Sequence, residues 1–247
     1  MKISVKKLKG FLLFLFLFSI LGQANLFSML RSMRPIHTLY TEDWIDSVSF
    51  SPDGSLLASG SANGEVYLWD FEEEILIRIL KGHTSCVVSM SFSPDGNLLA
   101  SGSSDKTVKL WSPRNGELIQ TLEWNTDRVC AVEFSSDGSL LAIGYLDETV
   151  KLWNPRTGEL IRTLEGHTGW VNSVLFNQDG SLLVNEFSDK TVDLFGPRDG
   201  ELIQTLKGHK DWVSSVSFSP DGSLLASGSL DGTVKLWDVS GLKYGSD

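Results

Sequence analysis

The chain has 247 residues, of which 41% are hydrophobic and 10% aromatic, with 23 glycines, 7 prolines and 2 cysteines. This composition excludes intrinsic disorder for most of the chain, and two cysteines are too few for a disulfide framework. The formal net charge is −10. The surface as a whole therefore repels the phosphates of nucleic acid and anionic lipid, and we expect no nucleic acid partner.

Residues 1–24 have the pattern of an export signal. Four lysines precede an apolar run from Phe11 to Leu21, and small residues end the segment at Gly22 and Ala24. We expect cleavage after Ala24 and a linker over residues 25–34. An uncleaved membrane anchor is the alternative, and the lysines before the apolar run then also place the body of the protein outside. The membrane is thus a partner only through this segment.

A third interpretation of the N-terminus stays open. Translation can also start at Met29 or Met33, just before the body of the chain. The protein would then lack a targeting segment and be cytoplasmic.

A repeat of 42 residues fills the rest of the chain, over about residues 41–80, 83–122, 125–164, 167–206 and 209–239, before a tail at 241–247. The aspartate of an Asp-Gly turn recurs at this spacing, at Asp53, Asp95, Asp137, Asp179 and Asp221. A later aromatic residue recurs at the same spacing, at Trp69, Trp111, Trp153, Phe195 and Trp237. A repeat of this length indicates stacked copies of one small structural unit.

Within one copy the pattern predicts four short strands, here Val87 to Phe92, Leu98 to Ser103, Thr107 to Trp111 and Leu118 to Leu122. Pro94, Asp95 and Gly96 form a tight turn between the first two strands. A sheet of this size cannot bury both faces alone, so successive copies must stack face to face. The predicted class is all-β.

The residues at the ends of the strands resemble those of the WD-repeat β-propeller family. Gly-His pairs precede the first strand of three copies, at His83, His167 and His209, and Trp-Asp pairs end the third strand at Asp70 and Asp238. The resemblance covers about residues 35–240. It implies a propeller of five four-stranded blades that binds protein or peptide partners without catalysis.

Closure of the ring is predicted to involve the start of the body. The last copy has no fourth strand after Asp238, whereas residues 35–40 are similar to the fourth strand of the other copies. We predict that this segment supplies the missing strand, so that its deletion should lower the melting temperature of the whole body.

Five blades are few for this family. We favour a closed ring. The alternatives are an open arc that forms a homo-oligomer with a second chain, and a fragment of a longer repeat protein.

The resemblance also assigns the recurring His, Ser, Asp and Trp to a buried hydrogen-bonded tetrad, in sets at His83, Ser101, Asp105, Trp111 and at His209, Ser227, Asp231, Trp237. A catalytic set would occur once, whereas these recur in register. We therefore predict no enzymatic activity, no cofactor and no metal.

The tetrad is incomplete in three copies, of which the first has Thr41 and Asn63 at tetrad positions. The third copy has Asn125 and Ile143, and the fourth has Asn185 and Phe195, at tetrad positions. We expect the third and fourth blades to open first in hydrogen exchange.

Binding residues are expected where the copies differ at one edge of the blades. The positions just before and within the first strand hold Trp44, Asp46, Arg128, Trp170, Asn172 and Trp212. By resemblance they surround the top of the central channel and form a protein or peptide site; a carbohydrate- or ligand-binding ring in an exported propeller is the alternative. Cys86 and Cys130 lie near the same edge, and we interpret them as two unrelated thiols.

Overall fold

The structure is a computed structural model that describes residues 38–123, 127–164, 169–187 and 189–242. The expected signal segment and linker lie outside the described residues, as do Asn125, His167 and residues 243–247. The chain divides into two units, Met1–Tyr40 and Thr41–Asp247, and the fold is that of the second. No helix among the described residues is long and apolar enough to cross a membrane.

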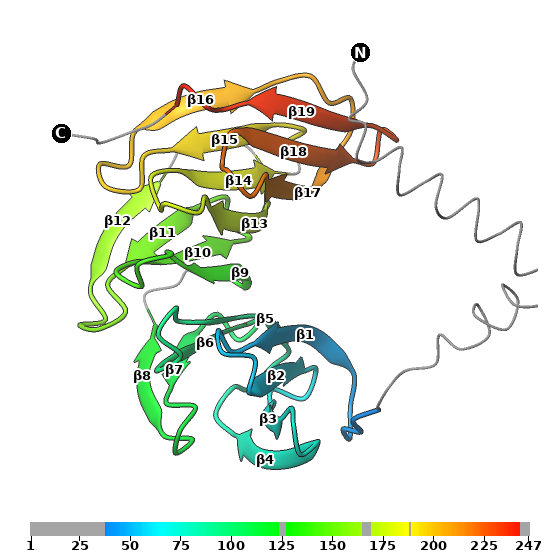
Figure 1. Ribbon diagram of the computed structural model, residues 1–247, viewed down its shortest axis with the longest axis vertical. Helices are drawn as coiled ribbons and strands as arrows, with labels where there is room; N and C mark the ends of the chain where they lie inside the picture. The colour runs from blue at the N-terminus through cyan, green and yellow to red at the C-terminus, as the bar shows by residue number, and fades with distance from the viewer. Residues whose placement is uncertain (1–37, 124–126, 165–168, 188, 243–247) are drawn as a thin grey trace, which may run out of the picture. The chain divides into compact units, whose positions relative to one another are not determined.

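The described residues form nineteen strands in five antiparallel sheets, which we call blades 1 to 5 (Figure 1). Blade 1 holds β1 (Ile45–Phe50), β2 (Leu56–Ser61), β3 (Val66–Asp70) and β4 (Ile75–Leu80). Blade 2 holds β5 (Val87–Phe92), β6 (Leu99–Ser103), β7 (Val108–Trp111) and β8 (Leu118–Leu122). Blade 3 holds β9 (Val129–Phe134), β10 (Leu141–Tyr145), β11 (Val150–Trp153) and β12 (Leu160–Leu164). Blade 4 holds β13 (Val171–Phe176), β14 (Leu183–Phe187), β15 (Val192–Phe195) and β16 (Leu202–Leu206). Blade 5 holds β17 (Val213–Phe218), β18 (Leu224–Ser229) and β19 (Val234–Asp238).

The all-β propeller predicted from the 42-residue repeat is confirmed, with one correction. The fifth sheet has three strands among the described residues, not four. Residues 38–40 form no strand, and residues 35–37 lie outside the described residues. Closure of blade 5 by residues 35–40 therefore stays a prediction.

The turn between the first and second strands shows why the repeat folds as it does. In blade 2, the Ser93 hydroxyl donates to Asp95 Oδ1 at 2.6 Å, and the Asn97 backbone N–H donates to the same oxygen at 3.0 Å. Gly96 has a φ of 70°, which favours glycine. The hydrogen bonds from Ser93 and Asn97 lower the pKa of the Asp95 carboxyl to about 2, so this turn keeps its charge at neutral pH.

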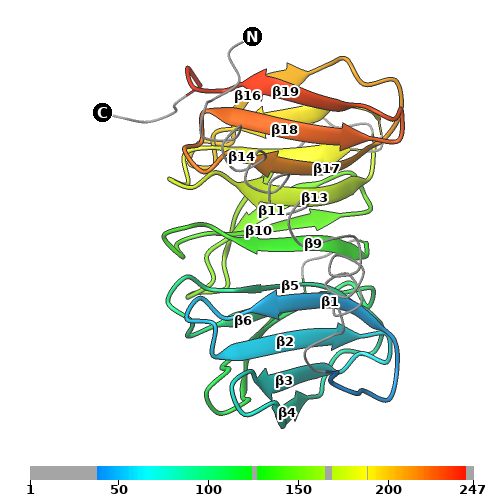
Figure 2. The same cartoon turned by 45° about the vertical axis from the view of Figure 1, so that its right-hand side comes forward.

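Four hydrophobic cores lie between successive blades, one at each joint. Between blades 2 and 3, Val108 and Leu110 of β7 share a core with Val132 and Phe134 of β9. The first strands of successive blades are neighbours, so that β5 packs against both β1 and β9 (Figures 1 and 2). A blade therefore buries both of its faces only when another blade packs on each side of it.

The outward faces of blades 1 and 5 are exposed. Val48 and Phe50 of β1 are 66% and 54% exposed, and Val234 and Leu236 of β19 are 72% and 69% exposed. The same positions in the other joints are buried, as at Leu110. These two faces are not packed against each other among the described residues, so the favoured closed ring of five blades, which would bury these side chains, stays a prediction.

Candidate functional site

The predicted binding residues lie on one edge of the blades, which we call the upper rim: the segments that lead into the first strands and the turns between the second and third strands. A repeated backbone hydrogen bond holds this rim. The carbonyl of Trp44 accepts from the N–H of Ala62 at 2.9 Å, and the carbonyl of Trp212 accepts from the N–H of Leu230 at 2.9 Å. The side chains at these positions thus project from a rigid backbone.

Three of the predicted residues come together between blades 4 and 5. The rings of Trp170 and Trp212 lie edge to face, with centroids 6.4 Å apart and an interplanar angle of 66°. Their side chains are 55% and 49% exposed. The Asn172 amide nitrogen lies 3.3 Å from Glu186 Oε1 and 3.4 Å from the carbonyl oxygen of Ser214. Asn172 therefore links blade 4 to blade 5 beneath the two tryptophans.

These residues border a cavity of about 300 Å³ on the upper rim, which we call the tryptophan cavity. Trp170, Asn172, Trp212 and Ser214 line it. Cys130, which the sequence placed near the same edge but not in the site, is a further wall, and the sequence-based prediction missed Leu146 and Leu230. Leu146 and Leu230 occupy positions where blades 1 and 2 have Ala62 and Ser104. A leucine in place of a small residue at the same position of the repeat was the signal available in the sequence.

The other three predicted residues do not line the tryptophan cavity. Trp44 is exposed on blade 1, and Asp46 accepts a hydrogen bond from the Cys86 thiol at 2.9 Å. The Arg128 backbone N–H donates to the Asp127 carboxylate at 2.8 Å. The six predicted residues thus form one compact group of three and three separate positions.

Both cysteines are free thiols. Burial, together with the Asp46 carboxylate, raises the pKa of the Cys86 thiol to about 12. Burial, with the carboxylates of Asp127 and Asp147, raises the pKa of Cys130 to about 11. A thiol with so high a pKa stays protonated at neutral pH and is a poor nucleophile.

The polar set of blade 2 forms a continuous hydrogen-bonded chain. His83 Nδ1 lies 2.9 Å from Asp105 Oδ2, and His83 Nε2 lies 2.8 Å from Ser101 Oγ. The Trp111 indole N–H donates to the same Ser101 oxygen at 2.8 Å. Burial opposes ionisation of Asp105, but hydrogen bonds from His83 and Thr107 outweigh it and hold the pKa of that carboxyl well below its ordinary value.

Blade 5 repeats this chain through His209, Ser227, Asp231 and Trp237, with His209 Nδ1 3.1 Å from Asp231 Oδ2 and His209 Nε2 2.8 Å from Ser227 Oγ. In both sets the two ring nitrogens of the histidine are already engaged. The histidines therefore tie the segment before the first strand to the second strand and to the turn that follows it, and are not held as bases toward a substrate.

Blades 3 and 4 lack parts of this chain. Among the described residues, the Trp153 indole nitrogen has no hydrogen-bond partner, because Ile143 replaces the serine. In blade 4, both amide atoms of Asn185 are buried without a partner, and Phe195 has no indole N–H. The incomplete tetrads predicted from the sequence are thus present among the described residues.

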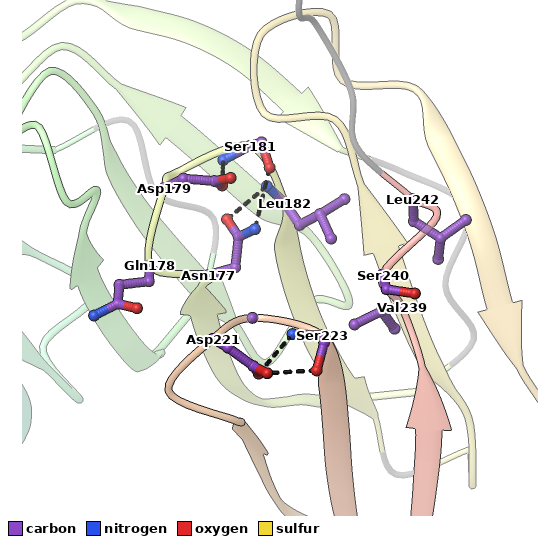
Figure 3. A pocket seen from close by; sticks show the side chains of 11 residues that line it. Asn177, Gln178, Asp179, Ser181, Leu182, Asp221, Ser223, Val239, Ser240 and Leu242 are labelled. Atoms are coloured by element: carbon purple, nitrogen blue, oxygen red, sulfur yellow. Dashed lines mark hydrogen bonds between the residues drawn. The ribbon is translucent and has the colours of Figure 1, made fainter.

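A second cavity, of about 380 Å³, lies between blades 4 and 5 at the opposite edge, which we call the lower rim (Figure 3). The turn after β13, with Asn177 and Asp179, forms one wall. Asp221 and the segment after β19, with Val239 and Leu242, form the other. The joint between these two blades is therefore hollowed at both rims.

The sequence matches the family model described as WD domain, G-beta repeat, over residues 33–70, 74–112, 116–154, 158–195 and 200–238. The chain belongs to the WD-repeat family. The matched copies recur with the period of the blades, but each of the last four begins at the fourth strand of one blade and ends with the third strand of the next. The recurring histidines and tryptophans are therefore part of the repeated framework of a WD-repeat protein.

Two relatives carry WD-repeat segments similar to parts of this chain. The nuclear distribution protein nudF 2 of Penicillium rubens is 44% identical over 55 residues, which are 22% of this chain and 12% of that protein. The general transcriptional corepressor TUP1 of Saccharomyces cerevisiae is 40% identical over 58 residues, 24% of this chain and 8% of that protein. The matched segments span about a tenth of the length of these relatives.

The third relative is the ciliary WD repeat-containing protein ctxp80 of Euplotoides octocarinatus, which is 30% identical over 70 residues, 28% of this chain and 10% of that protein. The names of the three relatives refer to nuclear distribution, transcriptional corepression and cilia. WD-repeat blades are thus common to proteins with different names and settings, and any activity of this chain must be argued from its own site.

Proposed function

We propose that this WD-repeat chain is a non-catalytic scaffold that binds a protein or peptide partner at the tryptophan cavity. The observation that carries the proposal is the pair of half-exposed indoles, Trp170 and Trp212, at a cavity bordered by blades 3, 4 and 5. Tryptophan is enriched among the residues that contribute most to protein interfaces, because it buries a large area with few rotatable bonds.

The rest of the chain supports a binding role. The tetrad side chains are engaged with one another, and both thiols have raised pKa values. WD-repeat membership and the resemblance of the rim to peptide-binding propellers favour a partner on this face. The rigid blades fix the two indoles before binding, so little conformational entropy is lost.

Selection from a displayed library of random peptides tests this proposal. We expect peptides selected on the full chain to lose at least about tenfold in affinity with the Trp170→Ala, Trp212→Ala double variant. Trp44→Ala is the matched control, because it removes an exposed tryptophan of the same rim outside the cavity. Peptides that bind the double variant as well as the unchanged chain would overturn the proposal. So would glycan binding that depends on the same two tryptophans in the absence of any peptide binding.

Two further proposals concern the setting of this scaffold. Residues 1–24 direct the chain to the export pathway, and cleavage after Ala24 gives a mature N-terminus at Asn25. N-terminal sequencing of the secreted or membrane-bound protein checks this, and a chain that starts at Met29 or Met33 would contradict it. The exposed faces of blades 1 and 5 favour self-association, which light scattering of the full chain measures.

A further inference from the structure

Glu186 occupies a position that is glycine in every other blade. The equivalent residues are Gly60, Gly102, Gly144 and Gly228, each separated by multiples of 42. In the joints after blades 1 to 3, this glycine lies against a valine of the next blade. A Cβ added at Gly60 would lie 2.7 Å from Val87 Cγ1, and a Cβ added at Gly102 or Gly144 would lie 2.5 Å from Cγ1 of the corresponding valine. A whole glutamate side chain at this place requires a wider joint.

The joint between blades 4 and 5 is wider at its first strand. Val216 and Phe218 of β17 are only partly buried, whereas Val132 and Phe134 at the same positions in blade 3 are 3% and 5% exposed. The tryptophan cavity opens at this joint. Glu186 therefore accompanies a local opening of the propeller on the rim that carries the proposed site.

The Glu186 carboxyl is buried and incompletely bonded. The residue is 1% exposed, Oε1 accepts from the Asn172 amide, and Oε2 has no hydrogen-bond partner in the part of the chain that the structure describes. Burial raises the pKa of this carboxyl to about 7, against the opposing effect of hydrogen bonds from Ser173 and Asn172. A buried oxygen without a partner is unfavourable, so a hydrogen-bond donor that reaches it would be bound favourably.

The surroundings of this carboxyl favour a cation. Asn172 lines the tryptophan cavity and contacts Glu186, so the carboxyl lies directly behind the cavity wall. Indole faces attract ammonium and guanidinium groups, and Trp170 and Trp212 stand at the cavity mouth. The net charge of −10 also attracts a basic partner.

We propose that the tryptophan cavity binds a lysine or arginine side chain of a peptide, with the aliphatic stem against Trp170 and Trp212 and the charged group bound by Glu186. The Asn172 side chain turns aside and yields its place on the carboxylate to the ligand. The inference rests on the proposed peptide-binding function and names the kind of residue that the site selects.

A set of four glycine-serine nonapeptides tests the selection, with arginine, lysine, citrulline or leucine at the centre. Citrulline keeps the shape of arginine but carries no charge. Binding to the full chain is followed by the NMR shifts of the tryptophan indole N–H groups. We expect the arginine and lysine peptides to bind at least about tenfold more tightly than the two neutral peptides.

Two variants of Glu186 assign the preference to this residue. Glu186→Gln keeps the side-chain shape, and Glu186→Gly restores the residue of the other blades; both should abolish the preference for the charged peptides. Glu133→Gln is the matched control, because burial also raises the pKa of the Glu133 carboxyl to about 7, but Glu133 is bonded by Ser91 of blade 2, whereas Glu186 is bonded by Asn172 of the cavity wall. The control should keep the preference.

Equal binding of the arginine and citrulline peptides to the unchanged chain, including no binding of either, overturns the inference. A preference that survives both Glu186 variants, or that falls equally in Glu133→Gln, also overturns it. The proposed function fails separately, when library peptides bind without Trp170 and Trp212. Library peptides that need both tryptophans but have no preferred basic residue would leave the proposed function standing and refute the role of Glu186.

Discussion

The joint between blades 2 and 3 and the joint between blades 4 and 5 are built from the same repeat but packed differently. In the first, Gly102 faces Val129, and Gly138 of one turn lies near Pro94 of the other. In the second, Glu186 replaces the glycine, and a Cβ at Gly222 of the turn would meet nothing within 4 Å. Close packing of repeats thus depends on a few small residues at their contact, and their loss coincides here with cavities at both rims.

The largest expected effect comes from placing glutamate, as at position 186 of blade 4, at the equivalent glycine of a closely packed joint. Gly102→Glu should destabilise the chain by at least about 3 kcal/mol, because it forces a carboxylate against Val129 and Val132. Urea unfolding measures this loss. Gly228→Glu is the control, because a Cβ there meets only the Ser215 carbonyl oxygen, at 3.9 Å, and it should cost little. Similar losses in both variants would contradict the packing difference.

The next effect compares an inner blade face with an outer one. Leu110 of β7 is buried in the joint between blades 2 and 3, whereas Leu236 is the same position on the exposed face of blade 5. Leu110→Ala should cost about 2–5 kcal/mol, and Leu236→Ala about 0.5 kcal/mol or less, in thermal or urea unfolding.

A large loss in the Leu236 variant would contradict the exposed face. It would mean that blade 1 or a second copy covers blade 5 in solution. Light scattering of the unchanged chain then decides between these two, because only a second copy raises the mass.

The sequence alone predicted the blades well because the repeat has no insertions. The 42-residue spacing of Asp53 and its counterparts placed the turns, and the WD-repeat resemblance and the propeller fold are confirmed. The site was harder to predict. The grouping of Trp170 with Trp212 depends on the width of one joint, which side chains from two blades determine together.

Glu186 shows the limit of the sequence analysis most clearly. Its departure from glycine was visible in register, but its consequence depends on how closely Val87 and its counterparts approach in the other joints. Leu146 and Leu230 were missed for a similar reason. They lie in turns that are 84 residues apart in the sequence but line the same cavity. Periodicity describes what blades share, whereas a site arises from what adjacent blades do not share.

A smaller effect distinguishes a complete tetrad from an incomplete one. Ser101→Ala removes the oxygen that bonds both His83 and Trp111, and should cost about 1–3 kcal/mol of unfolding free energy. Asn185→Ala removes an amide that has no hydrogen-bond partner, and should cost no more than about 1 kcal/mol. Ser227→Ala in blade 5 should behave like Ser101→Ala. A larger loss at Asn185 than at Ser101 would refute the comparison.

The smallest expected effect is a pH dependence specific to the wider joint. The pKa of Glu186 rises from 4.5 in the unfolded chain to about 7 in the folded chain, because of burial. Between these values the folded chain holds the extra proton, so the free energy of unfolding falls as the pH rises from about 4.5 to about 7, and then levels off. Glu186→Gln should remove this fall, on the order of 1 kcal/mol, in urea titrations at pH 5 and pH 8.

The effect of Glu186 on the pH dependence of stability can be distinguished from that of other carboxyl groups. The pKa values of Asp53 and Asp95 are lowered to about 2 by hydrogen bonds from serines and the following turn residues, so their stabilisation is lost only below about pH 4. Glu133 shifts in the same direction as Glu186, and Glu133→Gln measures its share alone. An identical pH dependence in Glu186→Gln and the unchanged chain would mean that the Glu186 carboxyl is ionised in the folded protein, so that the joint between blades 4 and 5 admits enough water to solvate it.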